Sequence, residues 1–164
     1  MSRLLIALLC ASGVALVASC STDKSSTTGS TILGVATSLD SYRIDNDEIR
    51  QPLAQISHDL EMGIDVFVSR DAGHCVLCHQ VDGLEAPFQG NLGPDLSDVG
   101  SRLTPAQLRF RIVDASRLNP ATVMPPYYRA NDLSQVPEVL RGKPVLSAAK
   151  IEHLVYFLSS LQGG

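Results

Sequence analysis

The chain contains no tryptophan and only four tyrosine and four phenylalanine residues among its 164, a thin supply of large side chains for a core. It shows no internal repeat, and no segment alternates apolar and polar residues as a half-buried strand does. Its 13 basic and 17 acidic residues leave a formal net charge of −4, which disfavours nucleic acid and anionic lipid headgroups as partners. The composition therefore predicts a small helical domain whose core is filled partly by something other than aromatic side chains.

Long apolar runs are also rare, and the clearest one lies at the N-terminus, from Leu4 to Ala18. Arg3 precedes it and small residues follow it, which is the pattern of a secretory signal peptide. The run is shorter than the about 20 residues that a membrane-spanning helix needs, although a retained N-terminal anchor stays an alternative. We therefore expect residues 1–19 to be a signal peptide and the mature protein to reach the periplasm.

Cysteine is scarce too, and one of the four residues directly follows this signal. Residues 17–20, VASC, resemble a bacterial lipobox, in which the cysteine is lipidated and becomes the first residue of the mature protein. Lipidation of Cys20 would tether the protein to the membrane through a flexible stretch rich in serine and threonine, whereas an ordinary signal peptide would leave it soluble. Residues 31–52 show no clear periodicity, so residues 20–52 are interpreted as a tether and a loosely packed arm.

Residues 53–164 have the pattern of a folded domain with three helices, expected at about 57–70, 105–115 and 147–161. Thr104 is expected to cap the second helix, and Gln107 to complete its capping box. The apolar stripes expected to face the core are Leu60, Ile64, Phe67 and Val68 in the first helix, and Ile151, Leu154, Val155, Leu158 and Leu161 in the third.

A glycine inside the first helix, Gly63, costs about 1 kcal/mol relative to alanine, so we expect another element to approach closely there. The first and last helices are therefore predicted to cross near Gly63, with Phe67 packing against the region of Leu154, Tyr156 and Phe157. Two long loops rich in glycine and proline connect the helices, and loops of that length usually carry function.

Two cysteines stand close together in the stretch AGHCVLCHQ, residues 72–80. A structural zinc site needs four ligands, and the chain has no second cysteine pair at matching spacing. A thioredoxin-like redox site belongs at the end of a strand, whereas this motif lies between a helix and a loop. The remaining interpretation is that C-x-x-C-H attaches a haem c covalently. Cys75 and Cys78 would then form thioethers with the two vinyl groups, and His79 would ligate the iron.

The opposite face of the iron either takes a second ligand or stays open, as in a peroxidase or gas sensor. Met124 lies in a proline-rich loop 45 residues after His79, a separation that lets the chain pass around the haem and return. A methionine ligand raises the reduction potential and suits single-electron transfer. The alternative for Met124 is packing against the haem edge or a partner, and Met62, on the first helix, is interpreted as a packing residue.

The other histidines are weaker candidates for this ligand. His74 is too near Cys75 to reach over the ring. His153 is expected on the face of the last helix opposite its apolar stripe, and His58 is expected to face solvent.

The sequence outside the haem motif resembles SoxX, the small monohaem subunit of the thiosulfate-oxidising SoxAX cytochrome. The likeness covers roughly residues 60–161 and rests on "GPDL", "VGSR", "NPATVMPPYYR" and "GKPVL". It implies an all-α, class I cytochrome c-like domain with long haem-wrapping loops and one covalently bound haem c. It also implies thioether sites at Cys75 and Cys78, axial iron ligands at His79 and Met124, and a carbonyl of Pro94 that accepts the N–H of the histidine.

The resemblance further implies a role and its partners. SoxX-type subunits form periplasmic heterodimers with a haem-bearing SoxA-type subunit, whose cysteine accepts thiosulfate and passes it to a sulfur carrier protein. The SoxX haem takes up the electrons and gives them to a downstream acceptor. This chain is therefore expected to be the electron-accepting subunit of an L-cysteine S-thiosulfotransferase complex, with no catalytic residue of its own. A free c-type electron carrier of a respiratory chain is the alternative.

Two features stay open beside this resemblance. The lipobox at Cys20 departs from the family pattern, whose members are usually soluble after cleavage. Arg102 and Arg129 either pair with haem propionates or a partner, or are solvated loop residues.

Overall fold

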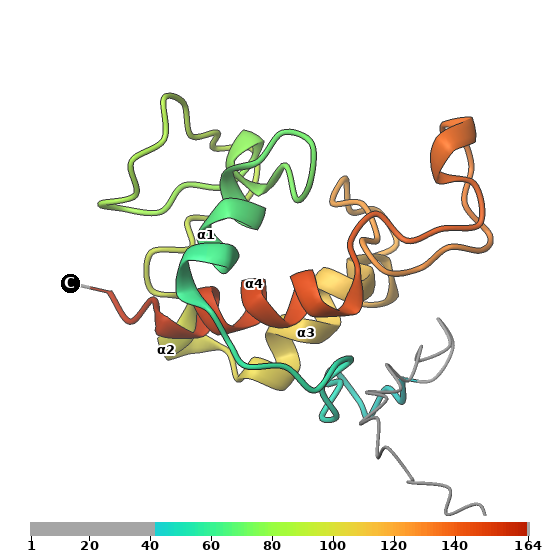
Figure 1. The fold of residues 1–164 in the computed structure, drawn as a ribbon, viewed down its shortest axis with the longest axis horizontal. Helices are drawn as coiled ribbons and strands as arrows, with labels where there is room; N and C mark the ends of the chain where they lie inside the picture. The colour runs from blue at the N-terminus through green and yellow to red at the C-terminus, as the bar shows by residue number, and fades with distance from the viewer. Residues whose placement is uncertain (1–41, 164) are drawn as a thin grey trace, which may run out of the picture. The chain divides into compact units, whose positions relative to one another are not determined.

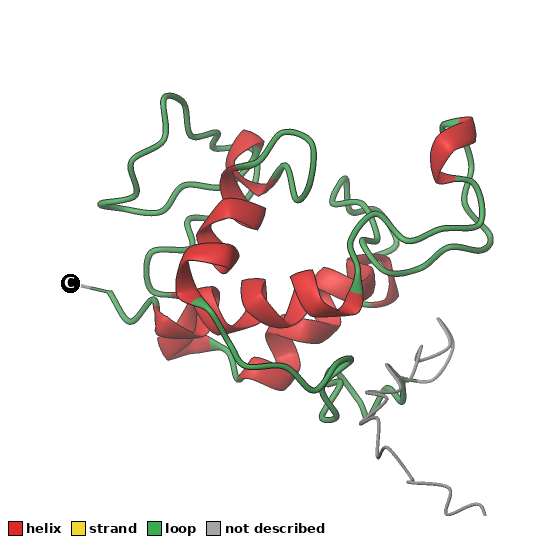
Figure 2. Cartoon of the chain, in the orientation of Figure 1, coloured by secondary structure: helices red, strands yellow, loops and turns green. Residues whose placement is uncertain are grey.

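The computed structural model describes residues 42–163, which contain α-helices and 3-10 turns and no extended strand (Figures 1 and 2). The predicted signal peptide and Cys20 lie outside the described residues. Within them, no helix is both long and apolar enough to cross a membrane. The elements, in chain order, are α1 (Leu60–Val68), η1 (Cys75–Leu77), α2 (Val99–Arg102), α3 (Pro105–Asp114), η2 (Ala115–Arg117), η3 (Glu138–Leu140) and α4 (Ala148–Ser160).

Helix α4 is the element against which the other helices pack, since α1, α2 and α3 all contact it (Figure 1). Its predicted stripe is buried at Ile151, Leu154, Val155 and Leu158. Ser147 caps α4 by accepting the N–H of Lys150 at 3.3 Å. The core therefore forms along one face of the last helix, as expected.

The predicted crossing of the first and last helices at Gly63 is confirmed. A Cβ atom at this position would meet the carbonyl oxygen of His153 and lie 2.6 Å from the Cβ of Phe157. Next to this contact, the rings of Phe67 and Phe157 pack edge to face with centroids 5.6 Å apart. Only glycine therefore permits this separation between the two helices.

The buried face of α1 differs from the predicted stripe. Asp59 caps the helix by accepting the N–H of Met62 at 3.1 Å, so the helix begins at Leu60, later than expected. Its buried residues are Gly63, Val66 and Phe67, whereas Leu60 is exposed. The contact at Gly63 sets which face is buried, and apolar spacing alone did not reveal that face.

A buried ion pair connects α3 to α4. Nε and Nη2 of Arg109 each donate to one carboxylate oxygen of Glu152 at 2.7 Å, and both side chains are almost inaccessible to solvent. The same guanidinium donates to the carbonyl of Ile49 at 2.7 Å, and Glu152 accepts the N–H of Leu53 at 2.8 Å. All four groups therefore form one network in the core.

Through this network, the described part of the N-terminal arm packs on the domain more tightly than the sequence suggested. Ile49 is fully buried, and its N–H donates to the carbonyl of Ala106 in α3 at 3.0 Å. The sequence missed this because one buried side chain and two backbone bonds leave no periodic pattern. The predicted start of the folded domain at residue 53 stays a prediction.

The second predicted helix is confirmed with its cap. Thr104 Oγ1 accepts the N–H of Gln107 at 3.2 Å, and the Gln107 side chain accepts the N–H of Thr104 at 3.1 Å. Helix α2 was not predicted, because four residues are too few to show helical periodicity.

Candidate haem-binding site

The cysteine motif forms one tight turn shortly after α1. His74 adopts a left-handed conformation with φ 56° and leads into η1. The N–H groups of Cys78 and His79 both donate to the carbonyl of Cys75, at 3.0 and 2.9 Å. Cys75, Cys78 and His79 all line one cavity of about 630 Å³. The turn thus brings together the three residues that the motif predicts for haem attachment.

The imidazole of His79 is held from behind by the loop that follows. Its Nδ1 lies 2.8 Å from the carbonyl oxygen of Pro94, which confirms the predicted hydrogen bond and leaves Nε2 free. A Cβ atom on Gly93 would lie 2.7 Å from Nδ1 and 2.9 Å from Nε2, so only glycine lets the backbone pass this close. A hydrogen bond of this kind sets the tautomer of a ligating histidine and raises its basicity.

Met124 lines the same cavity, whereas Met62 does not. The N–H of Met124 donates to Thr122 Oγ1 at 3.1 Å, and the N–H of Thr122 donates to the carbonyl of Asn119 at 3.0 Å. These bonds give the segment before Met124 a defined turn. Met62 is 47% exposed on α1, so its interpretation as a packing residue is wrong.

The remaining histidines fall in three different environments. His74 lines the cavity beside the cysteines. His58 is exposed, as predicted, and its ring stacks on Tyr156 with centroids 5.2 Å apart. His153 is buried, and its Nδ1 accepts the N–H of Asp59 at 3.1 Å, so its placement opposite the apolar stripe was wrong. Tyr156, expected in the crossing, is instead largely exposed.

Two arginines line the cavity together with its apolar walls. Arg102 Nε donates to Asp98 Oδ1 at 2.8 Å, and Arg111 Nη2 lies 3.6 Å from Asp47 Oδ2. Arg102 was a predicted candidate and Arg111 was not, although the helical spacing of Arg111 with Leu108 and Ile112 was a usable signal. The apolar walls come from Leu92, Leu96, Val99, Leu103, Leu108, Ile112, Leu118, Val123 and Leu158.

The environment of Cys75 does not suit a reactive dithiol. Burial raises the pKa of its thiol to about 12, so the thiol stays protonated near neutral pH. Burial likewise raises the pKa of the neighbouring Tyr127 phenol. Reactive cysteines have lowered pKa values, because the thiolate is the nucleophile. The raised pKa therefore disfavours thiol–disulfide exchange at Cys75.

These residues fit a haem c in chemistry and in arrangement. Two thiols and an imidazole with a free Nε2 lie beside a thioether, which is the ligand set of a His/Met cytochrome. The apolar walls suit a flat macrocycle, and the two guanidinium groups suit its carboxylates.

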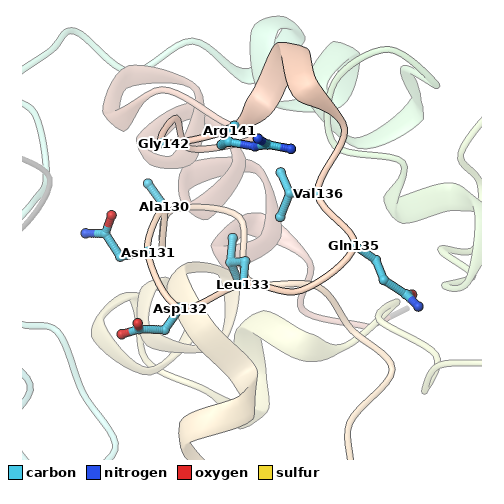
Figure 3. A pocket seen from close by; sticks show the side chains of 8 residues that line it. All are labelled: Ala130, Asn131, Asp132, Leu133, Gln135, Val136, Arg141 and Gly142. Carbon is cyan, nitrogen blue, oxygen red and sulfur yellow. The ribbon is translucent and has the colours of Figure 1, made fainter.

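A second cavity, of about 600 Å³, lies within the loop of residues 130–142 (Figure 3). Its lining is Ala130, Asn131, Asp132, Leu133, Gln135, Val136, Arg141 and Gly142. None of the predicted site residues reaches it, so the candidate chemistry belongs to the first cavity.

Comparison with solved structures gives one informative likeness. A chain in the crystal structure of SoxXA from P. pantotrophus matches with a TM-score of 0.68 and 29% sequence identity, over 74% of this chain and 94% of that chain. The c-type cytochrome SorU from Sinorhizobium meliloti matches with a TM-score of 0.42 and 20% identity, over 63% of this chain and 91% of that chain, too distant to add to the inference. No protein-family model matches the chain. No curated protein sequence matches it either.

The SoxXA likeness extends over nearly the whole of that chain. The chain is therefore similar to SoxX, as its sequence predicts, and has an all-α, class I cytochrome c-like fold.

Proposed function

We propose that this chain is a monohaem c-type cytochrome that transfers electrons in sulfur oxidation, as the SoxX-like subunit of a heterodimer with a haem-bearing SoxA-type partner. The observation that carries the proposal is the convergence of Cys75, Cys78, His79 and Met124 on one cavity. The likeness to SoxXA supports the choice of sulfur oxidation over general respiration.

Each of these side chains has a distinct part in the proposal. Cys75 and Cys78 would hold one haem c through thioether bonds, and His79 and Met124 would ligate its iron. When bound, the haem supplies a one-electron redox centre. The Pro94 carbonyl would keep the proton of His79 on Nδ1 and leave its Nε2 available to ligate the iron.

The side chains of the cavity wall have two roles in the proposal. The apolar side chains exclude water and so favour the reduced form, which carries less charge. Arg102 and Arg111 compensate the haem carboxylates. Cys75 and Cys78, the cysteines of residues 42–163, are used for attachment and so do not serve as substrate-binding nucleophiles.

The export and assembly of the protein complete the proposal. The partner subunit takes up thiosulfate and transfers it to a sulfur carrier protein, while this chain passes the electrons to a downstream acceptor. The mature protein works in the periplasm, with or without a lipid on Cys20. Fractionation of cells that carry wild-type protein or Cys20→Ala tests the lipid. Wild type in the membrane fraction with the variant in the soluble fraction would support lipidation of Cys20. Equal solubility of the two proteins would exclude lipidation.

Ligand substitution tests the haem site. Met124→Ala is expected to keep the covalent haem but lose the weak long-wavelength ferric absorption of methionine ligation, and to bind carbon monoxide when reduced. Met62→Ala is the matched control, because Met62 is exposed and absent from the cavity lining, and the spectrum of this variant should equal that of wild type. An unchanged spectrum in Met124→Ala would exclude Met124 as a ligand. Loss of attachment is expected when either Cys75 or Cys78 is replaced by serine.

Purification from native periplasmic extract tests the partner. A second haem protein at equal stoichiometry, with thiosulfate-dependent reduction of the pair, supports the sulfur-oxidation role. Recovery of the chain alone, or with a terminal oxidase, would assign it instead to a free respiratory carrier.

A further inference from the structure

A fully buried carboxylate lies at the end of α3, outside the cavity lining. Asp114 Oδ2 lies 3.4 Å from Nε of Arg117 and 3.5 Å from Nε of Arg129. Its other oxygen, Oδ1, accepts the N–H and the hydroxyl of Ser116. One side chain thus makes ion pairs with two arginines that lie 12 residues apart in the chain.

A buried carboxylate at the C-terminal end of α3 is unfavourable unless other groups compensate its charge. A negative charge at a helix C-terminus opposes the helix dipole, and a buried charge is costly unless it is paired. Among residues 42–163, Asp114 Oδ2 and Arg129 Nε are the buried side-chain atoms without a hydrogen-bond partner. The ion pairs with Arg117 and Arg129, at 3.4 and 3.5 Å, therefore compensate the charge on Asp114 Oδ2.

The two arginines mark the ends of the segment that carries Met124. At one end, the N–H groups of Leu118 and Asn119 donate to the carbonyl of Ala115, both at 3.0 Å. At the other end, the N–H groups of Tyr127 and Tyr128 donate to carbonyls of α3 at 3.2 and 3.3 Å. Both ends of the segment therefore return to the last turn of α3, where Asp114 lies.

We propose that Asp114 is a positioning residue that closes the segment of residues 117–129 at both ends and thereby holds Met124 in the haem cavity. The inference rests on the proposed function, in which Met124 ligates the iron. Asp114, Arg117 and Arg129 are absent from the cavity lining, so they act on the ligand through the closed segment. Without the carboxylate, the two guanidinium groups repel one another and the ends of the segment separate more easily.

Competition with an external ligand measures this directly. Imidazole is titrated into the ferric, full-length haem protein, and its apparent affinity reports how readily Met124 leaves the iron. Asp114→Asn is expected to raise that affinity by about tenfold, because it removes the shared partner of a buried ion pair. Arg117→Gln and Arg129→Gln should each raise it by a smaller factor. Arg141→Gln is the matched control: its side chain is 69% exposed and pairs with an exposed glutamate, so imidazole affinity should not change.

The outcomes separate positioning from general stability and from failure of the haem assignment. A lower melting temperature with unchanged imidazole affinity in all three variants would show a merely structural role and overturn the proposal. If Asp114→Asn does not accumulate, the two arginine variants, whose side chains are partly exposed, decide the question by the same criterion. A wild-type spectrum that lacks methionine ligation would overturn the ligand assignment and this inference together. A wild-type methionine signature with no variant effect overturns the inference alone.

Discussion

Replacing Arg109 by methionine is expected to destabilise the protein strongly, because it strands a carboxylate that has no contact with water. Glu152 is fully buried and receives three hydrogen bonds, two from the Arg109 guanidinium at 2.7 Å and one from the N–H of Leu53 at 2.8 Å. In Arg109→Met only the last of these remains. The carbonyl of Ile49 also loses its donor, at 2.7 Å.

The magnitude follows from these contacts. Removing one partner of a buried ion pair costs about 3–5 kcal/mol, and leaving a buried carbonyl without its donor adds about 1 kcal/mol or more. Domains of this size are stable by only about 5–15 kcal/mol, so the variant should be close to unfolding. The double variant Arg109→Met/Glu152→Gln removes the stranded charge and keeps an acceptor for Leu53. It should therefore be more stable than Arg109→Met alone.

Denaturant unfolding of the full-length haem protein, followed by far-ultraviolet circular dichroism, gives these free energies. Arg141→Met is the control, since its ion pair with Glu138 is exposed and contributes no more than about 1 kcal/mol. A loss below about 1 kcal/mol in Arg109→Met would refute the reasoning from the buried pair. A double variant less stable than the single variant would refute it equally, because it would show that the unpaired charge is not the source of the cost.

Three further outcomes are expected. Gly93→Ala should displace the imidazole of His79 and change the electron paramagnetic resonance of the ferric haem, since the added Cβ would lie 2.7 Å from Nδ1. Arg111→Gln should lower the reduction potential in a potentiometric titration, because removal of a positive charge from the cavity wall favours the oxidised haem. Ser97→Ala should raise the pKa of Asp95, measured by nuclear magnetic resonance, because the Ser97 hydroxyl holds that pKa below its usual range, assisted by its backbone N–H.

The stability that Asp95 contributes depends on pH. A carboxyl group with a lowered pKa in the folded state stabilises the fold above its unfolded pKa, and this contribution disappears as the pH falls through the folded value. In Ser97→Ala this contribution should shrink, so the variant should be less stable than wild type above the unfolded pKa of Asp95 and should lose less stability as the pH falls. An Asp95 titration identical in both proteins would contradict this. An unaltered electron paramagnetic resonance in Gly93→Ala would contradict the predicted displacement of His79. An unaltered reduction potential in Arg111→Gln would contradict the predicted effect of its charge.

Much of the fold could be predicted because its signals are local. The capping box at Thr104 and Gln107 lies within four residues and formed as expected. Gly63 indicated a close helix crossing, because a glycine inside an amphipathic helix needs a compensating contact. The buried face of α1, the burial of His153 and the ordered packing at Ile49 were not predicted. Each depends on a partner roughly 60 to 100 residues away in the chain, and no local pattern records such a partner.

The candidate site divides in the same way. The sequence by itself predicted haem attachment at Cys75, Cys78 and His79, because attachment of a haem requires those groups within one turn of the chain. Tertiary structure placed Met124, the predicted ligand, in the cavity lining and left Met62 exposed on α1. It also placed Arg111 in the cavity wall and Asp114 between its two arginines. Such contacts arise where segments distant in sequence meet, and their geometry exists only once the helices have packed.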